Sequence, residues 1–476
     1  MTQLDSIAAR LKAVGQDHLL RFHDSLSPGQ RDDLLGQIAA LDLDAIRDLV
    51  QRYVTGNPKI NLPARVEPAP YYPADPDSPP RPWDRAEARR RGERLLGEGK
   101  VAAFTVAGGQ GTRLGFDGPK GCFAAGAVTD KPLFQIFAEQ ILATSRRYGA
   151  GLPWFIMTSP LNHDQTVAFF REHAFFGLDE SGVSFFRQGV MPSFEIATGR
   201  ILLADRHRLA TNPDGHGGSI TALYKSGALD QMRARGVEHI CYFQVDNPLV
   251  RIADPVFLGL HAGAEDSSAQ MSSKMLPKAR PDERVGVFCL GDGRLCMIEY
   301  SDLPEDLQQQ RLDDGSLRFK AGNPAIHILS VAFVHRLNTD PSSALPFHRA
   351  LKKVPYVELE SGKRIEPDEP NAVKLERFVF DALPLADRSI VLETDRVQEF
   401  APIKNATGVD SAETSRALQT ERAARWLESV GVRVPRTPDG RPDCVLEISP
   451  LTALEAEDLR GATLPTAIGP GGRVAL

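Results

Sequence analysis

The amino-acid sequence predicts an α/β protein whose main domain is a doubly wound, mainly parallel β-sheet. From Lys100 onward, short apolar runs alternate with segments of helix length, beginning with VAAFTVA, LFQIFAEQILATSRRYG and PWFIMTS. Strands that are buried on both faces have such continuous apolar runs, and strands separated by helices pair in parallel through right-handed crossovers. The alternation continues through DQTVAFFREHAFFG, VSFFRQG, TALYKSGALDQMRARG and HICYFQVDN, which predict a helix, a strand, a helix and a strand.

The composition excludes several classes of protein. The chain has 476 residues, of which 42% are hydrophobic and 25% charged, as in folded proteins with more than one domain. Its net charge of −6 provides no positive field for DNA or RNA. No apolar run approaches the roughly 18 residues of a membrane span, and the acidic residues near the N-terminus are unlike a secretory signal. We therefore expect a cytoplasmic protein that binds neither nucleic acid nor membrane, and the composition is compatible with a monomer.

The cysteines are too scattered for a disulfide framework. They are odd in number and include no Cys-x-x-Cys pair, so the sequence indicates no zinc site either. We expect reduced side chains in the protein core at Cys122, Cys241, Cys289, Cys296 and Cys444.

Residues 1–95 read as a helical region with a proline-rich connector. Apolar residues recur at helical spacing in LDSIAARLKAV and in DDLLGQIAALDLDAIRDLVQRYV, and Pro28 suits a first helical position. Residues 62–83 contain eight of the chain's 35 prolines, so we expect an extended connector outside any sheet. The charged stretch RAEARRRGERLLGEG then predicts a helix with a solvated face.

Residues 96–384 form the predicted catalytic domain, and residues 385–476 have a different sequence pattern. The C-terminal region contains short β-like pieces and Gly/Pro turns, such as SIVLETD, CVLEISPL and TLPTAIGPGGRVAL. These pieces predict a smaller, β-rich C-terminal domain.

The most informative stretch is VAGGQGTRLGFDGPKG, residues 106–121, which directly follows the first buried strand. Gly108 and Gly109 let the backbone approach a ligand and expose N–H donors, while Arg113 and Lys120 add positive charge. Open α/β sheets bind phosphates at this position, where a strand leads into a loop. The stretch therefore predicts a phosphate-binding loop, with a plain tight turn as the alternative.

Two familiar phosphate-binding motifs do not fit this loop. The Walker pattern needs Gly-Lys-Ser/Thr, whereas Lys120 lies between Pro119 and Gly121. The dinucleotide fingerprint needs a third glycine where the chain has Leu114. If the loop binds phosphate, it does so through a motif different from both of these.

The string GGQGTRLGFDGPKG resembles the signature of sugar-nucleotide pyrophosphorylases. Further strings along nearly the whole chain resemble the eukaryotic-type UDP-N-acetylhexosamine pyrophosphorylases, among them FFRQGVMP, PDGHGG, QVDNPLVRIADP, NAVKLERFVFDAL, APIKNA and LEISPL. The resemblance implies a Rossmann-like nucleotidyltransferase domain with a helical N-terminal extension and a C-terminal β domain. It also implies the conversion of UTP and N-acetylglucosamine 1-phosphate to UDP-N-acetylglucosamine and pyrophosphate.

This reaction joins two polyanions, so it needs a metal carboxylate and several cations. Asp246 ends the apolar strand HICYFQV, faces the expected ligand crevice, and is the candidate ligand for Mg²⁺, with Mn²⁺ as an alternative. Arg113 and Lys120 suit the phosphates of the leaving group. The resemblance places Lys404 over the reacting phosphates and nominates Lys374 for the sugar-phosphate side.

Uracil recognition requires donors and acceptors at the base edge. Gly108 and Gly109 offer backbone donors. The resemblance implies that Gln188, in RQGVMP, and Gly215, in PDGHGG, contact the base.

For the sugar, the resemblance nominates Gly286, Glu299 and Asn323, and a carboxylate such as Glu299 can accept two hydroxyl hydrogen bonds. His216 departs from the family pattern, because the N-acetylhexosamine enzymes have asparagine at this position, where it meets the N-acetyl group. UDP-glucose pyrophosphorylases have a comparable Gly-His-Gly stretch. A neutral histidine presents one donor and one acceptor, so we expect activity with the N-acetyl sugar but weaker discrimination against glucose 1-phosphate.

Three alternatives remain open from the sequence. The protein could be a UDP-glucose or broad-specificity UDP-sugar pyrophosphorylase, or a catalytically silent protein that binds UDP-sugars. A nicotinamide dehydrogenase is disfavoured by the missing third glycine.

Overall fold

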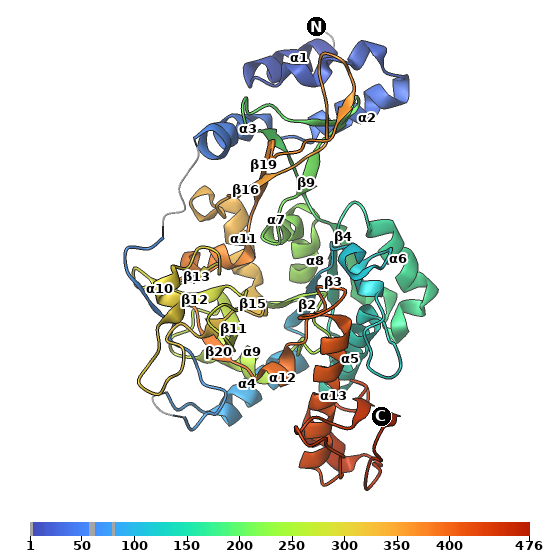
Figure 1. Cartoon of the computed structure of the whole chain (residues 1–476), viewed down its shortest axis with the longest axis vertical. Coiled ribbons are helices and arrows are strands. Elements are labelled where there is room, and N and C mark those ends of the chain that lie inside the picture. The colour runs from blue at the N-terminus through green and yellow to red at the C-terminus, as the bar shows by residue number, and fades with distance from the viewer. Residues whose placement is uncertain (1–2, 57–61, 79–80) are drawn as a thin grey trace. The chain divides into compact units, whose positions relative to one another are not determined.

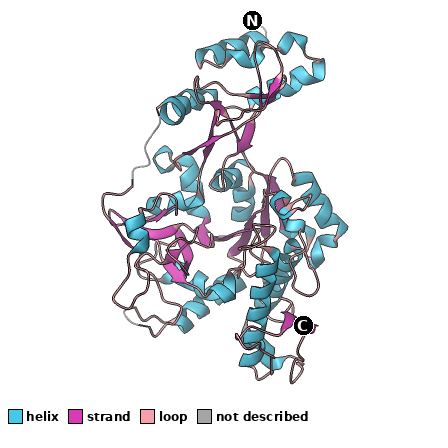
Figure 2. Cartoon of the chain, in the orientation of Figure 1, coloured by secondary structure: helices cyan, strands magenta, loops and turns pink. Residues whose placement is uncertain are grey.

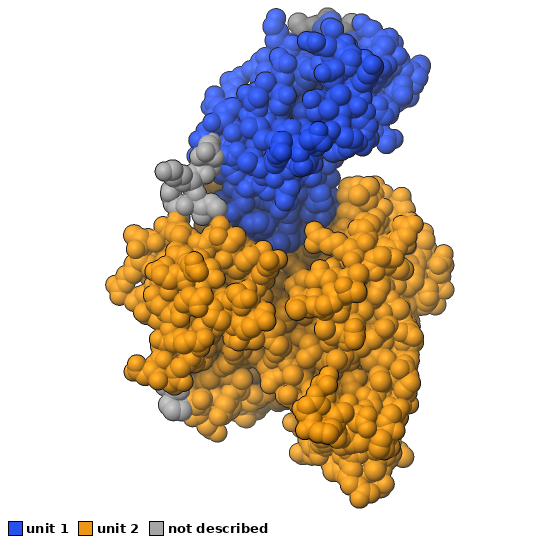
Figure 3. Space-filling model, in the orientation of Figure 1, with its two compact units in different colours: residues 1–61, 188–219, 345–381 blue, residues 62–187, 220–344, 382–476 orange. Residues whose placement is uncertain are grey.

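The computed structural model describes residues 3–56, 62–78 and 81–476, and the chain divides into two compact units. Unit 1 comprises residues 1–61, 188–219 and 345–381, and unit 2 comprises residues 62–187, 220–344 and 382–476 (Figure 3). This division differs from the linear domains expected from the sequence, because the N-terminal helices share a unit with two segments from the middle of the chain. Among the described residues, no helix is long and apolar enough to cross a membrane.

Unit 1 contains the N-terminal helices and several short strands. Its helices are α1 (Gln3–Ala13), α2 (Pro28–Ala39) and α3 (Leu43–Leu49). Its strands are β5 (Val190–Pro192), β6 (Phe194–Glu195), β7 (Leu203–Asp205), β8 (Arg208–Leu209), β9 (Thr211–Pro213), β16 (His348–Lys352), β17 (Tyr356–Val357), β18 (Arg364–Ile365) and β19 (Ala372–Glu376). The predicted helices are confirmed, and Pro28 occupies the first position of α2 behind the N-cap Ser27. Leu34, Ile38 and Ile46 of these helices pack in one core with Val373 and Leu375 of β19.

Unit 2 is built on an eleven-stranded sheet with the order β1-β12-β14-β11-β15-β10-β2-β3-β4, to which β13 and β20 are added (Figure 1). Its strands are β1 (Val66–Pro68), β2 (Val101–Val106), β3 (Trp154–Thr158), β4 (Val183–Arg187), β10 (His239–Gln244), β11 (Met271–Pro277), β12 (Val287–Gly291), β13 (Arg294–Ile298), β14 (Ala321–Gly322), β15 (His327–Ser330) and β20 (Val391–Glu393). Strands β10, β2, β3 and β4 are parallel, and the first five residues of β2 and β10 are all buried, as their apolar runs predict.

The expectation of a mainly parallel sheet is wrong for the other half of the sheet, which makes the sheet mixed. Beyond β10, strand β15 is antiparallel to β10, and β11 is antiparallel to both β15 and β14. Strands β12 and β13 form a hairpin around Asp292 and Gly293, both of which have positive φ. Such a two-residue turn joins antiparallel strands, whereas a parallel pair needs a longer crossover.

Helices pack around the strands of unit 2 (Figure 2). They are α4 (Arg85–Gly97), α5 (Leu133–Tyr148), α6 (His163–Glu172), α7 (Gly218–Lys225, which begins in unit 1), α8 (Ala228–Ala234), α9 (Pro255–Gly263), α10 (Glu305–Gln309), α11 (Val331–Thr339), α12 (Arg396–Glu399) and α13 (Ala412–Ser429). Leu96 of α4, Phe137 of α5 and Phe257 of α9 share one core with Ala103 of β2 and Phe243 of β10. These helices cover one face of the parallel strands, while Phe104 and Tyr242 meet ring to ring on the other.

Three further expectations need correction. The proline-rich connector does join a sheet, because β1 pairs with β12 at the sheet edge, where proline is tolerated. The segment expected to be one helix, residues 221–236, belongs to α7 and α8, which are separated at Ser226–Gly227.

The expectation of a β-rich C-terminal domain is also wrong. The long helix α13 dominates this region, β20 belongs to the central sheet, and β21 (Cys444–Glu447) and β22 (Gly472–Ala475) form only a two-stranded sheet.

The cysteines all lie in the described part of the chain and are free thiols. Cys241 and Cys289 are buried, as expected of core residues, whereas Cys122, Cys296 and Cys444 are half-buried.

Candidate functional site

The glycine loop leaves the sheet at the carboxyl end of β2 and is held in a fixed shape. The N–H of Gly111 donates to the carbonyl of Gly118 at 2.9 Å, and the N–H of Lys120 donates to the carbonyl of Gly109 at 3.1 Å. Gly111 lies so close to Phe116 that a Cβ at this position would come within 2.6 Å of the aromatic ring. The loop therefore folds back on itself and needs glycine at its point of closest approach.

Asn162 anchors this loop, and sequence reasoning missed it. Its side chain is fully buried, and its Nδ2 donates to the carbonyls of Ala107 at 3.0 Å and Gly109 at 3.2 Å. The N–H groups of Gly108 and Gly109 have no hydrogen-bond partner among the described residues. They are thus available to a ligand, as the sequence predicts for a phosphate or base.

Arg113 and Lys120 both belong to the glycine loop. Arg113 is exposed in the short helical turn Thr112–Leu114, and Lys120 is half-buried at the start of the next turn, Lys120–Cys122. The loop thus presents cations together with free backbone donors.

Asp246 lies beside the glycine loop. Val106 and Gln244 are direct partners in the parallel pair β2–β10, so residues 108 and 246 leave the same edge of the sheet side by side. Asp246 is buried at 9% exposure. The expected carboxylate and the expected phosphate loop therefore meet at one place.

Lys404 is brought to Asp246 by the backbone that precedes it. The N–H of Ile403 donates to the carbonyl of Asp246 at 2.8 Å, although 157 positions separate the two residues in the numbering. The Lys404 side chain is 40% exposed, with Nζ 3.7 Å from Oδ2 of Asp410. A carboxylate and a lysine that the resemblance nominates separately are thus neighbours in the fold.

Gly286, Glu299 and Asn323 also come together within unit 2. Val287 is paired with both Ile298 and Gly322, so the three nominated residues lie one position beyond these pairs. The N–H of Asn323 donates to the carbonyl of Gly286 at 2.8 Å. A Cβ at Gly286 would lie 2.2 Å from the sulfur of Met297, so a larger residue there would require the Met297 side chain to move.

Gln188 and Gly215 belong to unit 1 and contact each other. Nε2 of Gln188 donates to Oδ1 of Asp214 at 3.1 Å and to the carbonyl of Gly215 at 3.0 Å. Both partners are acceptors, so they determine which end of the amide carries the hydrogens. Oε1 of Gln188 is consequently the acceptor left for a ligand. Sequence reasoning missed Asp214, which is the buried acidic residue of PDGHGG.

His216 is enclosed by aromatic rings of unit 1. Its ring stacks on Phe378, with centroids 5.1 Å apart, and its Nδ1 accepts a hydrogen bond from the N–H of Val379 at 3.2 Å. Burial, with a smaller contribution from His348, lowers the pKa of His216 to about 4. Because Nδ1 is occupied as an acceptor, the ring offers only the Nε2–H donor, in contrast to the donor and acceptor expected from the sequence.

Lys374 lies on β19, opposite Ala350 of β16. The nominated residues therefore divide into two sets. Gly108, Gly109, Arg113, Lys120, Asp246, Gly286, Glu299, Asn323 and Lys404 belong to unit 2, and Gln188, Gly215, His216 and Lys374 belong to unit 1.

A glycine loop with free backbone N–H donors lies beside a carboxylate at the end of a parallel strand, an arrangement typical of α/β proteins that bind phosphates. Comparison with known proteins identifies the family. Residues 82–418 match the family described as UTP–glucose-1-phosphate uridylyltransferase. The chain is 37% identical to UDP-N-acetylhexosamine pyrophosphorylase-like protein 1 of Homo sapiens, with 96% of this chain and 94% of the human protein aligned. It is also 37% identical to UDP-N-acetylglucosamine pyrophosphorylase of Saccharomyces cerevisiae, over 72% of this chain and 73% of the yeast protein.

The fold agrees with these relatives. The crystal structure of the uridine diphosphate N-acetylglucosamine pyrophosphorylase of Trypanosoma brucei in complex with an inhibitor matches with a TM-score of 0.79 at 28% identity, covering 97% of this chain and 94% of that one. The chain belongs to the UTP–glucose-1-phosphate uridylyltransferase family, a family of nucleotidyltransferases.

Proposed function

We propose that this protein transfers the uridylyl group of UTP to N-acetylglucosamine 1-phosphate, forming UDP-N-acetylglucosamine and pyrophosphate. An oxygen of the sugar phosphate attacks the α-phosphorus of UTP, and the bond to the β,γ-pyrophosphate breaks. The phosphate nucleophile is already ionised, so the residues of the chain serve to orient two polyanions and to neutralise charge. The names of two relatives at 37% identity support the choice of sugar.

The observation that supports the chemistry is the backbone hydrogen bond from Ile403 to Asp246, which brings the chain at Lys404 next to the chain at Asp246. In this proposal Lys404 neutralises the reacting phosphates, while Arg113 and Lys120 attract the phosphates that leave. The free N–H groups of Gly108 and Gly109 donate to the nucleotide.

Asp246 is the residue that would hold Mg²⁺ or Mn²⁺. Among the described residues, no group of three or more His, Cys, Asp or Glu side chains is arranged to hold a metal ion. One buried carboxylate at a strand end nevertheless suits Mg²⁺, which commonly takes one or two protein carboxylates and completes its shell with water and substrate phosphates. The bound ion would supply charge neutralisation at the phosphates.

A broad-specificity or UDP-glucose pyrophosphorylase is the second candidate function, and His216 favours it. With only an Nε2–H donor to offer, His216 can serve an acetamido oxygen or a sugar hydroxyl equally well. The substrates are small molecules under either proposal, and the cytoplasmic location stays a prediction.

Pyrophosphate release from UTP tests the proposal. The purified protein is incubated with Mg²⁺, UTP and, in turn, the 1-phosphates of N-acetylglucosamine, N-acetylgalactosamine, glucose and galactose. We expect release with N-acetylglucosamine 1-phosphate at the highest kcat/KM and measurable release with glucose 1-phosphate. Binding of UDP-sugar without any release would instead support the silent binding protein.

A further inference from the structure

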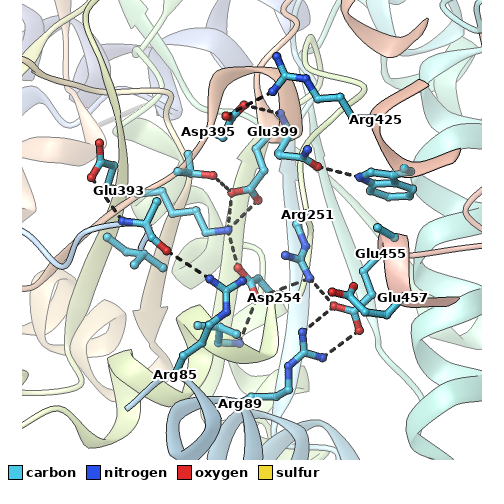
Figure 4. Close-up of a pocket in the computed structure, with 18 of the residues that line it drawn as sticks. Arg85, Arg89, Arg251, Asp254, Glu393, Asp395, Glu399, Arg425, Glu455 and Glu457 are labelled. Atoms are coloured by element: carbon cyan, nitrogen blue, oxygen red, sulfur yellow. Dashed lines mark hydrogen bonds and ion pairs between the residues drawn. The ribbon is translucent and has the colours of Figure 1, made fainter. Parts of the chain in front are cut away.

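A buried lysine forms ion pairs with two carboxylates next to the segment that carries Lys404. Lys274 of β11 is only 1% exposed, and its Nζ lies 2.7 Å from Oδ2 of Asp254 and 2.6 Å from both carboxylate oxygens of Glu399. The two carboxylates come from different elements, because Asp254 precedes α9 and Glu399 ends α12; both are labelled in Figure 4. The hydroxyl of Thr394 donates a further hydrogen bond to Glu399. A charge buried this deeply is stable only when it is fully paired, so the pairing holds these elements together.

Asp254 attaches the ion pairs of Lys274 to the first turn of α9. Asp254 caps α9, where its Oδ1 accepts from the N–H of Val256 at 3.0 Å. Burial alone would raise the pKa of Asp254, but Arg251 and Lys274 outweigh burial and hold the pKa below its ordinary value. Lys274 therefore links the carboxylate that caps α9 to Glu399 at the end of α12.

At its other end, the group is tied to the strand-end site through Asn247. Nδ2 of Asn247 donates to the carbonyl of Glu399 at 2.6 Å, and its Oδ1 accepts from the N–H of Ala401 at 3.0 Å. The next alternate residue, Ile403, donates to Asp246. Residues 399, 401 and 403 are thus all fixed to Asp246 or Asn247, and Lys404 is the next residue.

The surroundings of α12 explain why polar contacts matter here. The helix borders a cavity of about 390 Å³ through Gln398 and Glu399. The cavity is lined by opposite charges, among them Arg85, Arg89, Arg425, Glu393, Asp395 and Glu455 (Figure 4). A helix face that borders a cavity makes few van der Waals contacts. Hydrogen bonds and ion pairs must therefore hold this side of α12 in place.

We infer that Asn247, Lys274 and Glu399, which we call the brace, are positioning residues that hold Lys404 beside Asp246. The inference rests on the proposed function, because it assigns to the brace the orientation of a lysine that acts on reacting phosphates. None of the three brace residues needs to touch a substrate. A misplacement of about 1 Å in such a group can cost roughly 100-fold in rate, which is why a remote ion pair would matter to catalysis.

Two variants test the brace by two readouts. Lys274→Met/Glu399→Gln removes both charges of the Lys274–Glu399 pair and leaves Asp254 with Arg251 as its cation. Asn247→Ala removes the amide without changing charge. For each we expect kcat with N-acetylglucosamine 1-phosphate to fall about 10- to 100-fold, while KM for UTP changes less than about 3-fold. We also expect faster hydrogen–deuterium exchange in the peptide that covers residues 400–404.

The matched control is Arg85→Met/Glu457→Gln, which removes one cation and one anion from the lining of the same cavity and leaves the Arg425–Asp395 ion pair at the start of α12 intact. Its kcat and exchange should equal those of the unmodified protein. The inference is overturned if the brace variants behave like this control, or if kcat falls without faster exchange in residues 400–404. If the double variant does not fold, Asn247→Ala decides by the same criteria.

The two readouts separate this inference from the proposed function. Should the unmodified protein release no pyrophosphate, the proposed function fails, and the exchange measurement still reports whether the brace orders residues 400–404.

Discussion

Nδ1 of His216 accepts a hydrogen bond from the backbone N–H of Val379, and this contact determines which proton the imidazole carries. The remaining nitrogen, Nε2, must bear the hydrogen while the ring is neutral. With its pKa lowered to about 4, the ring stays neutral near neutral pH. His216 is therefore a neutral ring whose remaining hydrogen-bond donor is Nε2–H.

The first prediction concerns sugar choice. Asparagine at position 216 would present a donor and an acceptor, and so would satisfy both polar groups of an acetamido substituent. In His216→Asn, the ratio of kcat/KM for N-acetylglucosamine 1-phosphate over glucose 1-phosphate should rise about 2- to 10-fold, the value of one hydrogen bond. Steady-state kinetics with both sugars measures this ratio. An unchanged or falling ratio would show that His216 does not face the substituent at C2.

The second prediction concerns pH. The unfolded chain protonates His216 near pH 6.5, whereas the folded chain keeps it neutral down to about pH 4. The contribution of His216 to the free energy of unfolding is thus complete above pH 6.5 and is lost as the pH falls toward 4. Between pH 7 and about pH 5, protonation of His216 should lower the free energy of unfolding of the unmodified protein by about 1 to 2 kcal/mol. In His216→Asn this part of the decrease should be absent. Urea unfolding at both pH values tests this, and equal losses in the two proteins would contradict it.

The third prediction concerns the base. Both amide hydrogens of Gln188 are used by Asp214 and Gly215, so its Oε1 can accept the N3–H of uracil, which cytosine lacks. Gln188→Ala should reduce the kcat/KM preference for UTP over CTP by about 10-fold. Gln419→Ala, at a buried glutamine whose amide donates to Ala125, serves as the control and should keep the preference. If both variants discriminate equally well, Gln188 does not contact the base.

The fourth prediction concerns the reacting phosphates. Asp246→Ala should lower kcat about 100- to 10,000-fold at saturating Mg²⁺, because the carboxylate that would hold the ion is lost. Lys404→Ala should lower kcat about 100- to 1,000-fold with a smaller change in KM. Lys100→Ala, which removes a half-buried lysine paired with Glu238, is the control. Circular dichroism should report a native fold for all three, and near-normal turnover of Asp246→Ala would refute the metal assignment.

The fifth prediction concerns the attachment of the C-terminal region. Glu455 accepts two hydrogen bonds from Arg89, at 2.8 and 2.6 Å, and lies 3.2 Å from Arg147. Glu455→Gln should reduce the free energy of unfolding by about 1 to 3 kcal/mol at pH 7. The exposed Glu457→Gln should have no measurable effect.

The pH dependence of this effect has a definite sign. The hydrogen bonds from Arg89 lower the pKa of Glu455, followed by the charges of Arg251, Arg89 and Arg147, against the opposing effect of burial. The stability that ionised Glu455 contributes is therefore complete above the ordinary pKa of 4.5 and is lost as the pH falls below it. The difference between Glu455→Gln and the unmodified protein should shrink in acid, and a constant difference would argue that charge is not the cause.

Several elements were predictable from local sequence because their physics is local. Strands β2, β3 and β10 are buried on both faces, so most of their residues are apolar, and α5 has the apolar spacing of a helix that packs on a sheet. The glycine loop was predictable for the same reason, since its glycines and cations lie within 16 residues of sequence. The hairpin half of the sheet and helix α13 were not predicted, because short apolar runs do not reveal the direction of their partners.

The sequence by itself determined the parallel core, the position of the glycine loop and the family to which the chain belongs. Only the tertiary structure decided which polar groups meet: Asn162 with the glycine loop, Asp214 with Gln188, Val379 with His216, and Lys274 with Glu399. The physical reason is that a buried polar side chain needs a hydrogen-bond or ion-pair partner, and the fold brings that partner from a distant part of the chain. Lys274 and Glu399 are 125 positions apart, so no periodicity or motif in the sequence records their pairing.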